Sequence, residues 1–181
     1  MKFLYILLFL IIIIGILAII YVLYYNKMQF LKTKIEQAEG IIDETLRERY
    51  DILVRASNIV KTILNDGKDY FKDVIQMKDK ALTNFEMDRN LKDAFNTLNK
   101  LIDDFPDLQK NKELKEILTH IKATNERITA TTSYYNKNTN ELNGYIRKFP
   151  SNIVGKIHKF KISAFFDGKD MTDDIYDDFK L

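Results

Sequence analysis

The chain contains no cysteine among its 181 residues. This absence excludes disulfide bonds, thiolate metal ligands, a cysteine nucleophile and a lipid-modified amino-terminal cysteine. Only two prolines and six glycines are present, whereas 30% of the residues are charged. Because strand-rich folds depend on frequent turns, and turns on glycine and proline, this composition favours an all-α protein with long helices.

Sequence signals of catalysis and of nucleic-acid binding are also scarce. The net charge is +2, far from the strongly basic balance of nucleic-acid-binding domains, so we expect no nucleic-acid partner. His120 and His158 are the only histidines, and they lie far apart without the clustered ligands that a zinc site needs. The sequence contains no phosphate-binding glycine loop and no G-x-S-x-G motif. We therefore predict a protein that is not an enzyme, with no catalytic residues, no cofactor and no metal.

Residues 3–25 form one uncharged apolar run, FLYILLFLIIIIGILAIIYVLYY. At a rise of about 1.5 Å per residue, a helix of this length would span the ~30 Å hydrocarbon core of a bilayer. A cleaved signal peptide is the alternative, but the run is too long and lacks a small-x-small cleavage site around Ala18. We predict a transmembrane anchor over residues 1–26 that contacts membrane lipid through residues 3–25. Aromatic residues gather at lipid–water boundaries, and the boundary here would fall at Tyr21, Tyr24 and Tyr25.

The orientation of this anchor follows from the lysines on either side of it. Lys27, Lys32 and Lys34 flank its carboxyl side, whereas Lys2 stands alone on the other side. Positive charge near a transmembrane helix favours the cytoplasmic side. We therefore expect a single-pass protein of the cell membrane whose body lies in the cytoplasm and whose amino terminus lies outside.

Residues 27–149 carry apolar side chains at helical spacing and predict an elongated antiparallel bundle of three long helices, connected up-down-up. The first helix would end near Gly67, the second would halt at Pro106, and the third would start at Asn111 and end before Pro150. The weakest part of the second helix is residues 86–90, where a break or kink would fall. A coiled-coil oligomer is the competing architecture. The third helix keeps a seven-residue apolar step at Leu114, Ile121, Ile128, Tyr135, Leu142 and Phe149.

Polar side chains interrupt the expected core near its middle. Arg49 lies on the seam of the first helix, and it would be level with about residue 130 if the first and third helices run parallel. These residues are either solvated or form a polar layer that fixes the register or binds a partner, because a buried charge is costly unless paired. The candidate residues of this polar layer are Arg49, Thr124, Thr131, Tyr135 and Asn138.

The segment 150–166 is basic and amphipathic, and an acidic tail, residues 167–181, follows it. We expect a short helix in which Phe149, Ile153, Ile157 and Phe160 pack on the far end of the bundle. The lysines of this segment, Lys156, Lys159 and Lys161, would then stay in solvent and attract the tail. A contact with anionic lipid is the alternative, but in an up-down-up bundle the third helix would end away from the membrane.

Several short stretches of the body match the motifs of one known family, in the same order along the chain. The first is Arg47-Glu48-Arg49-Tyr50-Asp51-Ile52-Leu53, which is similar to the RR-x-DLI segment of the LemA family, although Val54 and Arg55 replace its usual proline and asparagine. Further matches, in order, are Phe105-Pro106-Asp107-Leu108, Asn125-Glu126-Arg127-Ile128, Tyr134-Tyr135-Asn136, Phe149-Pro150-Ser151-Asn152-Ile153, Phe160-Lys161 and Phe165-Phe166. The resemblance implies an amino-terminal membrane span followed by an antiparallel helical bundle. It implies no catalytic residues.

The expected function is therefore binding. We expect a membrane-anchored, non-enzymatic scaffold or adaptor with an unidentified protein partner, and self-association into a homo-oligomer stays open. One alternative is a regulatory partner of a membrane protease or envelope machine, which would co-purify with an activity. The other is a lipid-binding or membrane-remodelling protein, which would bind anionic vesicles.

Overall fold

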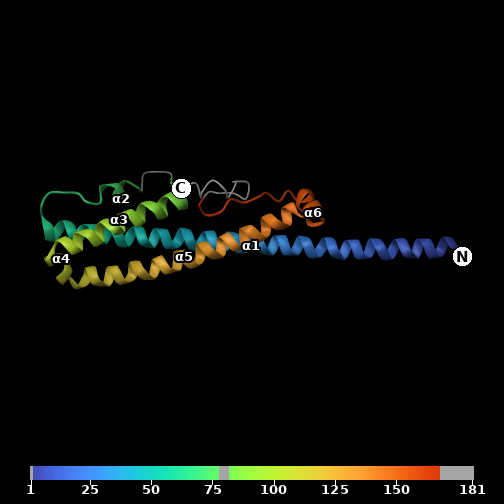
Figure 1. Ribbon diagram of the computed structural model, residues 1–181, viewed down its shortest axis with the longest axis horizontal. Helices are drawn as coiled ribbons and strands as arrows, with labels where there is room; N and C mark the ends of the chain where they lie inside the picture. Colours follow the sequence, from blue (N-terminus) through green and yellow to red (C-terminus); the bar gives the residue numbers. More distant parts are fainter. Residues whose placement is uncertain (1, 78–81, 168–181) are drawn as a thin grey trace, which may run out of the picture. The chain divides into compact units, whose positions relative to one another are not determined.

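The computed structural model of the protein describes residues 2–77 and 82–167, and within these residues it is all-helical. The helices are α1 (Lys2–Leu64), α2 (Lys72–Gln76), α3 (Asn84–Asp104), α4 (Pro106–Lys110), α5 (Lys112–Arg147) and α6 (Ser151–Ile157) (Figure 1). The chain divides into two compact units, Met1–Gln37 with Tyr135–Leu181 and Ala38–Tyr134. We call them the terminal unit and the central unit.

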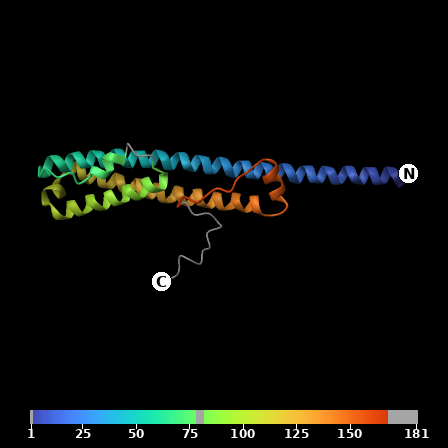
Figure 2. The same cartoon turned by 90° about the horizontal axis from the view of Figure 1, so that it is seen from above.

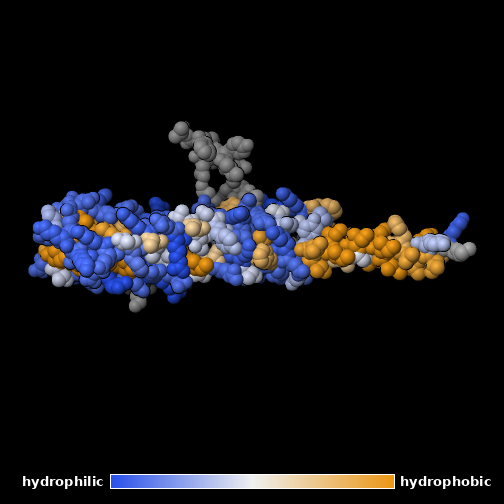
Figure 3. Space-filling view, turned by 90° about the horizontal axis from the view of Figure 1, so that it is seen from below, coloured by the Kyte–Doolittle hydropathy of each residue, from blue (hydrophilic) through white to orange (hydrophobic). Residues whose placement is uncertain are grey.

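Helix α1 joins the apolar run to the first helix of the body without interruption. From Lys2 to Ile20 every side chain is exposed, and this part of the surface is almost uniformly hydrophobic (Figure 3). It is long and apolar enough to cross a membrane. The helix becomes one-sided from Met28 onward, where residues at helical spacing are buried: Met28, Leu31, Ile35, Ala38, Ile42, Ile52 and Ala56.

In the central unit, α1 and α5 run antiparallel and α3 runs in the same direction as α1 (Figures 1 and 2). Glu48 of α1 reaches both His120 and Arg127 of α5, and Glu44 also reaches Arg127. The expectation that the first and third long helices run parallel is therefore wrong. The predicted second helix would have run antiparallel to α1. In the structure α3 instead runs in the same direction as α1, so α5, which follows it, runs antiparallel to α1 (Figures 1 and 2).

Between α1 and α3, the described residues 65–77 and 82–83 contain only short helical structure. Helix α1 ends at Leu64, and Asn65 and Gly67 then adopt positive φ values of 44° and 73°. Glycine accepts this conformation readily, so the predicted helix end at Gly67 is confirmed. Only α2 and the residue after it are helical before position 78, and α3 has 21 residues. The prediction of a long second helix is therefore wrong.

Helix α3 starts with a capping box rather than breaking at residues 86–90. The Thr83 hydroxyl accepts a hydrogen bond from the Glu86 amide, and the Glu86 carboxylate accepts one from the Thr83 amide. Two unpaired amides of the first turn are thereby satisfied. The predicted break at 86–90 is wrong, because the helix runs through it. The halt at Pro106 is confirmed, since α3 ends at Asp104 and Pro106 opens α4.

Helix α5 begins as the sequence predicts. The Asn111 side chain accepts a hydrogen bond of 2.9 Å from the Leu114 amide, which is the geometry of an amino-terminal cap. Four of the six residues at the seven-residue step are buried, Tyr135 is half-buried, and Phe149 is 80% exposed. The seven-residue pattern therefore marks the core face up to Leu142 and fails at its last member.

In the terminal unit, α5 runs antiparallel to α1 and α6 lies beside α1 (Figures 1 and 2). Tyr24 packs on Tyr145, and Lys27 forms a 2.8 Å ion pair with Glu141. The core of the unit consists of Met28, Leu31, Ile35, Leu142 and Val154. Three separate segments of the chain therefore contribute to this core: α1, α5 and α6.

Candidate functional site

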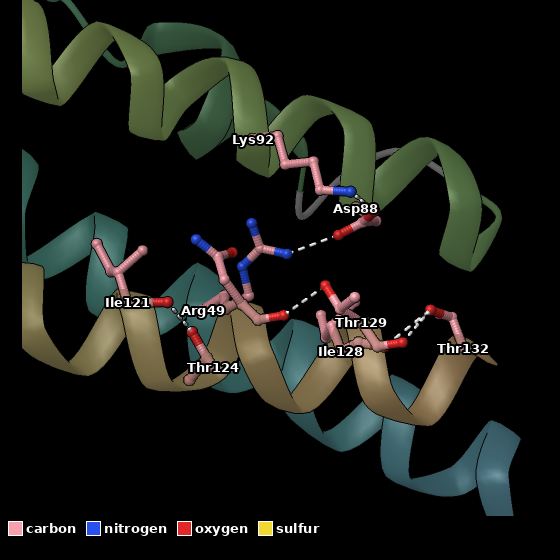
Figure 4. A network of polar contacts seen from close by, with 9 residues as sticks. Arg49, Asp88, Lys92, Ile121, Thr124, Ile128, Thr129 and Thr132 are labelled. Atoms are coloured by element: carbon pink, nitrogen blue, oxygen red, sulfur yellow. Dashed lines mark hydrogen bonds and ion pairs between the residues drawn. The ribbon is translucent and has the colours of Figure 1, made fainter. Parts of the chain in front are cut away.

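The core of the central unit contains an ion pair. The Arg49 guanidinium of α1 donates a 2.6 Å hydrogen bond to the Asp88 carboxylate of α3, and Lys92 donates a 2.7 Å bond to the other oxygen of that carboxylate (Figure 4). The Arg49 side chain is 1% exposed and that of Asp88 is 4% exposed, whereas Lys92 reaches solvent. We call Arg49, Asp88 and Lys92 the charge cluster.

Within the charge cluster, both oxygens of the Asp88 carboxylate accept hydrogen bonds, whereas only one nitrogen of the Arg49 guanidinium donates one to a described residue. Among the residues that the structure describes, Nε and Nη2 of Arg49 have no hydrogen-bond partner, although both atoms are buried. A buried charge is stable only when paired, and removing its partner is strongly destabilising. The cluster thus makes the contact between α1 and α3 specific, because an apolar residue opposite Arg49 would leave a bare charge in the core.

The two candidate threonines nearby form hydrogen bonds within their own helix. The Thr124 hydroxyl donates to the Ile121 carbonyl at 2.8 Å (Figure 4), and the Thr131 hydroxyl donates to the Arg127 carbonyl at 2.8 Å. Such local bonds satisfy a hydroxyl without a partner from another helix. Thr124 is buried with Arg49 in the same unit, and Thr131 is half-buried. Arg49 and Thr124 are therefore core residues rather than exposed contact residues.

An exposed group of charges lies on the α1–α5 side of the central unit. Arg127 approaches Glu44 at 3.5 Å and Glu48 at 3.6 Å, and His120 lies 3.8 Å from Glu48. We call these four residues the exposed ionic patch. Exposed ion pairs contribute at most about 1 kcal/mol each to stability. The patch therefore contributes little to the stability of the central unit.

The terminal unit buries neutral polar groups instead. The Asn143 side-chain amide donates to the Ser163 carbonyl at 2.8 Å and accepts from the Ser163 amide at 2.9 Å. Asn136 accepts a 2.8 Å bond from the Phe166 amide. The Tyr135 hydroxyl donates to the Ala164 carbonyl at 3.2 Å. Side chains of α5 therefore hold the extended segment 160–166, which we call the strap.

Sequence reasoning missed Asn136 and Asn143. A signal was present, because the two asparagines are seven residues apart and so lie on one face of a helix. Asparagine is also a poor residue for a helix interior, which suggests another role at these positions. Of the predicted polar layer, Tyr135 binds the strap and Asn138 is buried in the terminal unit.

The predicted packing of the segment after α5 is largely wrong. Phe149 is 80% exposed, Ile153 50% and Ile157 58%, whereas Val154 and Gly155 are the buried residues of α6. The physical reason is the phase of the helix: Val154 and Gly155 lie on the side that meets Met28 of α1, and the Ser151 hydroxyl donates a hydrogen bond to the Tyr145 carbonyl of α5, so Ile153 and Ile157 face away. Phe160 does pack on a core, but on that of the terminal unit, which includes Met28, rather than at the predicted far end of the bundle, and Lys156, Lys159 and Lys161 are exposed. The acidic tail beyond Asp167 lies outside the described residues, so its predicted attraction to these lysines stays a prediction.

One electrostatic effect in the terminal unit is local to a single ion pair. The hydrogen bond to Glu141, opposed in part by desolvation, raises the pKa of Lys27 and so favours its charged form. Across residues 2–77 and 82–167, no three histidine, aspartate or glutamate side chains come together as metal ligands would.

Together, these features define an all-helical protein with an exposed apolar amino-terminal helix and a body whose helices are held by buried polar contacts. The sequence model of the LemA family matches residues 38–176, so the chain belongs to the LemA family. Searches of curated proteins and of solved structures found no match to the chain.

Proposed function

We propose that this LemA-family chain is a single-pass membrane protein whose body binds protein partners as a non-enzymatic scaffold or adaptor. The observation that supports the membrane-spanning part of this proposal is the exposed, uncharged surface at the start of α1. Residues 2–20 expose every side chain, and residues 3–25 contain no charge. Water would solvate such a surface poorly, whereas the hydrocarbon core of a bilayer would accept it.

The exposed ionic patch supports the adaptor role. The patch carries both signs of charge on two antiparallel helices: Glu44, Glu48, His120 and Arg127. A partner with the complementary arrangement of charges would bind such a surface specifically. The buried charge cluster supports the same role indirectly, since a fixed helix arrangement keeps that surface in one geometry. We propose the patch, rather than Arg49 itself, as the partner-binding surface.

Membrane anchoring is tested by comparing the full chain with a variant that lacks residues 3–23. The full chain should stay in the membrane fraction after alkaline carbonate extraction, and the deletion variant should leave it. Orientation is tested with a reporter that is active only in the cytoplasm, fused after Leu181. Since Lys27, Lys32 and Lys34 follow the apolar run, this reporter should be active. Activity only from an exported reporter would reverse the orientation.

Partner binding is tested by photo-crosslinking in native membranes. A photoreactive residue at Glu44 or His120 should give one defined crosslinked product, and the same residue at the exposed Lys61 or Asp103 should not. A diffuse pattern from both sets would reject the patch as a specific surface. A product that carries a protease or other enzyme would instead favour the regulatory alternative.

A further inference from the structure

Helix α6 is fixed against the last turns of the apolar run. The Tyr21 hydroxyl lies 2.6 Å from Nε2 of His158, and the Tyr25 ring centroid lies 4.4 Å from that of His158. Val154 enters the core next to Met28, and a Cβ at Gly155 would lie only 3.2 Å from the Met28 side chain. Because Tyr21 and Tyr25 belong to the run 3–25, α6 lies at the level where that run ends.

The outer side of this segment combines exposed apolar and basic residues. Ile153, Lys156 and Ile157 are adjacent on the side of α6 opposite to Val154 and Gly155, and all three are exposed. The sequence from Leu142 to Phe166 contains no acidic residue. We call the following exposed residues the α6 face: Lys148, Phe149, Ile153, Lys156, Ile157 and Lys159.

A local conformation adds to this pattern. Lys159 has a φ of 55°, and the Phe160 amide donates to the Gly155 carbonyl at 2.9 Å, which closes the helix. Glycine would accept this left-handed conformation more easily than lysine. A cation therefore stands at a position where the backbone alone would favour glycine, and such outliers concentrate at functional sites.

We propose that the α6 face is a second membrane contact, which inserts its apolar residues at the headgroup level of the bilayer that α1 crosses and binds anionic lipid through its lysines. The inference rests on the proposed membrane anchoring. Aromatic and aliphatic side chains flanked by lysine are the composition of interfacial membrane-binding elements. The surface adjoins the last turns of the apolar run through the contacts of His158 with Tyr21 and Tyr25, and its charge is complementary to anionic headgroups. In the up-down-up bundle predicted from the sequence, the third long helix would end far from the membrane. In the structure, the end of α5 lies beside Tyr24 of the apolar run, so distance does not argue against a lipid contact.

The test uses the full chain in lipid vesicles, and the absence of cysteine makes labelling at one introduced cysteine unique. An environment-sensitive fluorophore is attached to Ile153→Cys in the α6 face, to Asn140→Cys on the exposed side of α5, or to Leu17→Cys in the apolar run. Each protein is placed in phosphatidylcholine vesicles with and without phosphatidylglycerol. Quenching by a lipid-borne quencher is compared with quenching by iodide in water.

The expected result is lipid quenching at positions 17 and 153 and iodide quenching at position 140, with the signal at 153 stronger when phosphatidylglycerol is present. Replacing Lys156 and Lys159 by glutamine should weaken the docking equilibrium at position 153 roughly fivefold per lysine on anionic vesicles. The same replacement at the exposed Lys61 and Lys100 should leave it unchanged.

The outcomes separate this inference from the proposed anchoring. If position 17 is in lipid and position 153 is quenched by iodide like position 140, the α6 contact is wrong and the anchor stands. If position 17 is quenched by iodide, the anchoring itself fails. Shielding at position 153 that disappears when the protein is diluted among more vesicles would show a contact with a second copy, and it would also overturn the lipid contact.

Discussion

Among the described residues, the buried charged groups belong to the central unit, which also buries neutral groups such as Thr124, whereas the buried polar groups of the terminal unit are neutral. The central unit buries an ionised pair, Arg49 with Asp88, and two guanidinium nitrogens lack a partner among the described residues. The terminal unit buries neutral groups, such as the Asn143 amide, which matches both the donor and the acceptor of Ser163. Removing one member of an ionised pair leaves a charge without solvent, whereas removing an amide leaves only dipoles. Removing one buried polar side chain should therefore destabilise the central unit more than the terminal unit.

The sharpest test of this difference is Arg49→Ala. Asp88 would keep only the exposed Lys92 as a partner, so we expect a loss of about 3–5 kcal/mol in the free energy of unfolding, the range for breaking a buried pair. Chemical denaturation of the full chain in detergent micelles measures it. A loss below about 0.5 kcal/mol, as at an exposed site, would show that water reaches Arg49 and would remove the contrast between the units.

A double variant separates charge burial from packing. Replacing Arg49 by methionine and Asp88 by leucine together removes both charges, and buried pairs replaced by apolar residues often cost little. The double variant should therefore recover most of the stability lost in Arg49→Ala. If it is as unstable as the single variant, the loss comes from packing volume rather than from charge.

The second test concerns the neutral contacts. Asn143→Ala would leave the amide and carbonyl of Ser163 without their partners, and we expect a loss of about 1–3 kcal/mol, smaller than at Arg49. Hydrogen exchange at the Ser163 amide should also accelerate, because the strap loses its attachment. Asn140→Ala on the exposed side of α5 is the matched control and should change neither quantity. Unchanged protection at Ser163 in the Asn143 variant would show that other contacts hold the strap.

The features that the sequence predicts best are those that depend on neighbouring residues. The apolar run, the helix end at Gly67 and the cap at Asn111 each follow from a few residues and from backbone geometry. The all-helical class follows from composition in the same way. These features do not depend on how the helices pack against one another.

The features that the sequence does not reveal depend on contacts between distant segments. Asp88 occupies an apolar seam position of α3, three residues before Leu91. From the sequence alone, a charged residue at such a position suggests that the helix is interrupted. In the structure its charge is paired with Arg49 of α1, a contact between distant segments. The direction of α5 relative to α1 also has no signal in periodicity, because an amphipathic helix presents the same stripe whether it runs up or down. The incorrect packing of Ile153 and Ile157 has a separate cause, the phase of α6, which buries Val154 and Gly155 instead.

The smallest effect is expected at a polar contact that is not buried at all, the cap of α3. Hydrogen bonds from the Thr83 amide and hydroxyl lower the pKa of Glu86 from its ordinary value of 4.5. A lowered folded-state pKa means that the cap stabilises the fold above the unfolded-state value, and that this contribution is lost as the pH falls through the folded-state pKa. Glu86→Gln keeps a cap without a titrating group, so the difference in unfolding free energy between the two proteins should be largest near neutral pH and shrink in acid. The pKa of Asp66 is lowered too, chiefly by the Tyr70 hydroxyl, but this contribution is common to both proteins and cancels in the comparison. A difference that stays constant from neutral to acidic pH would show that the Glu86 carboxylate does not stabilise the start of α3.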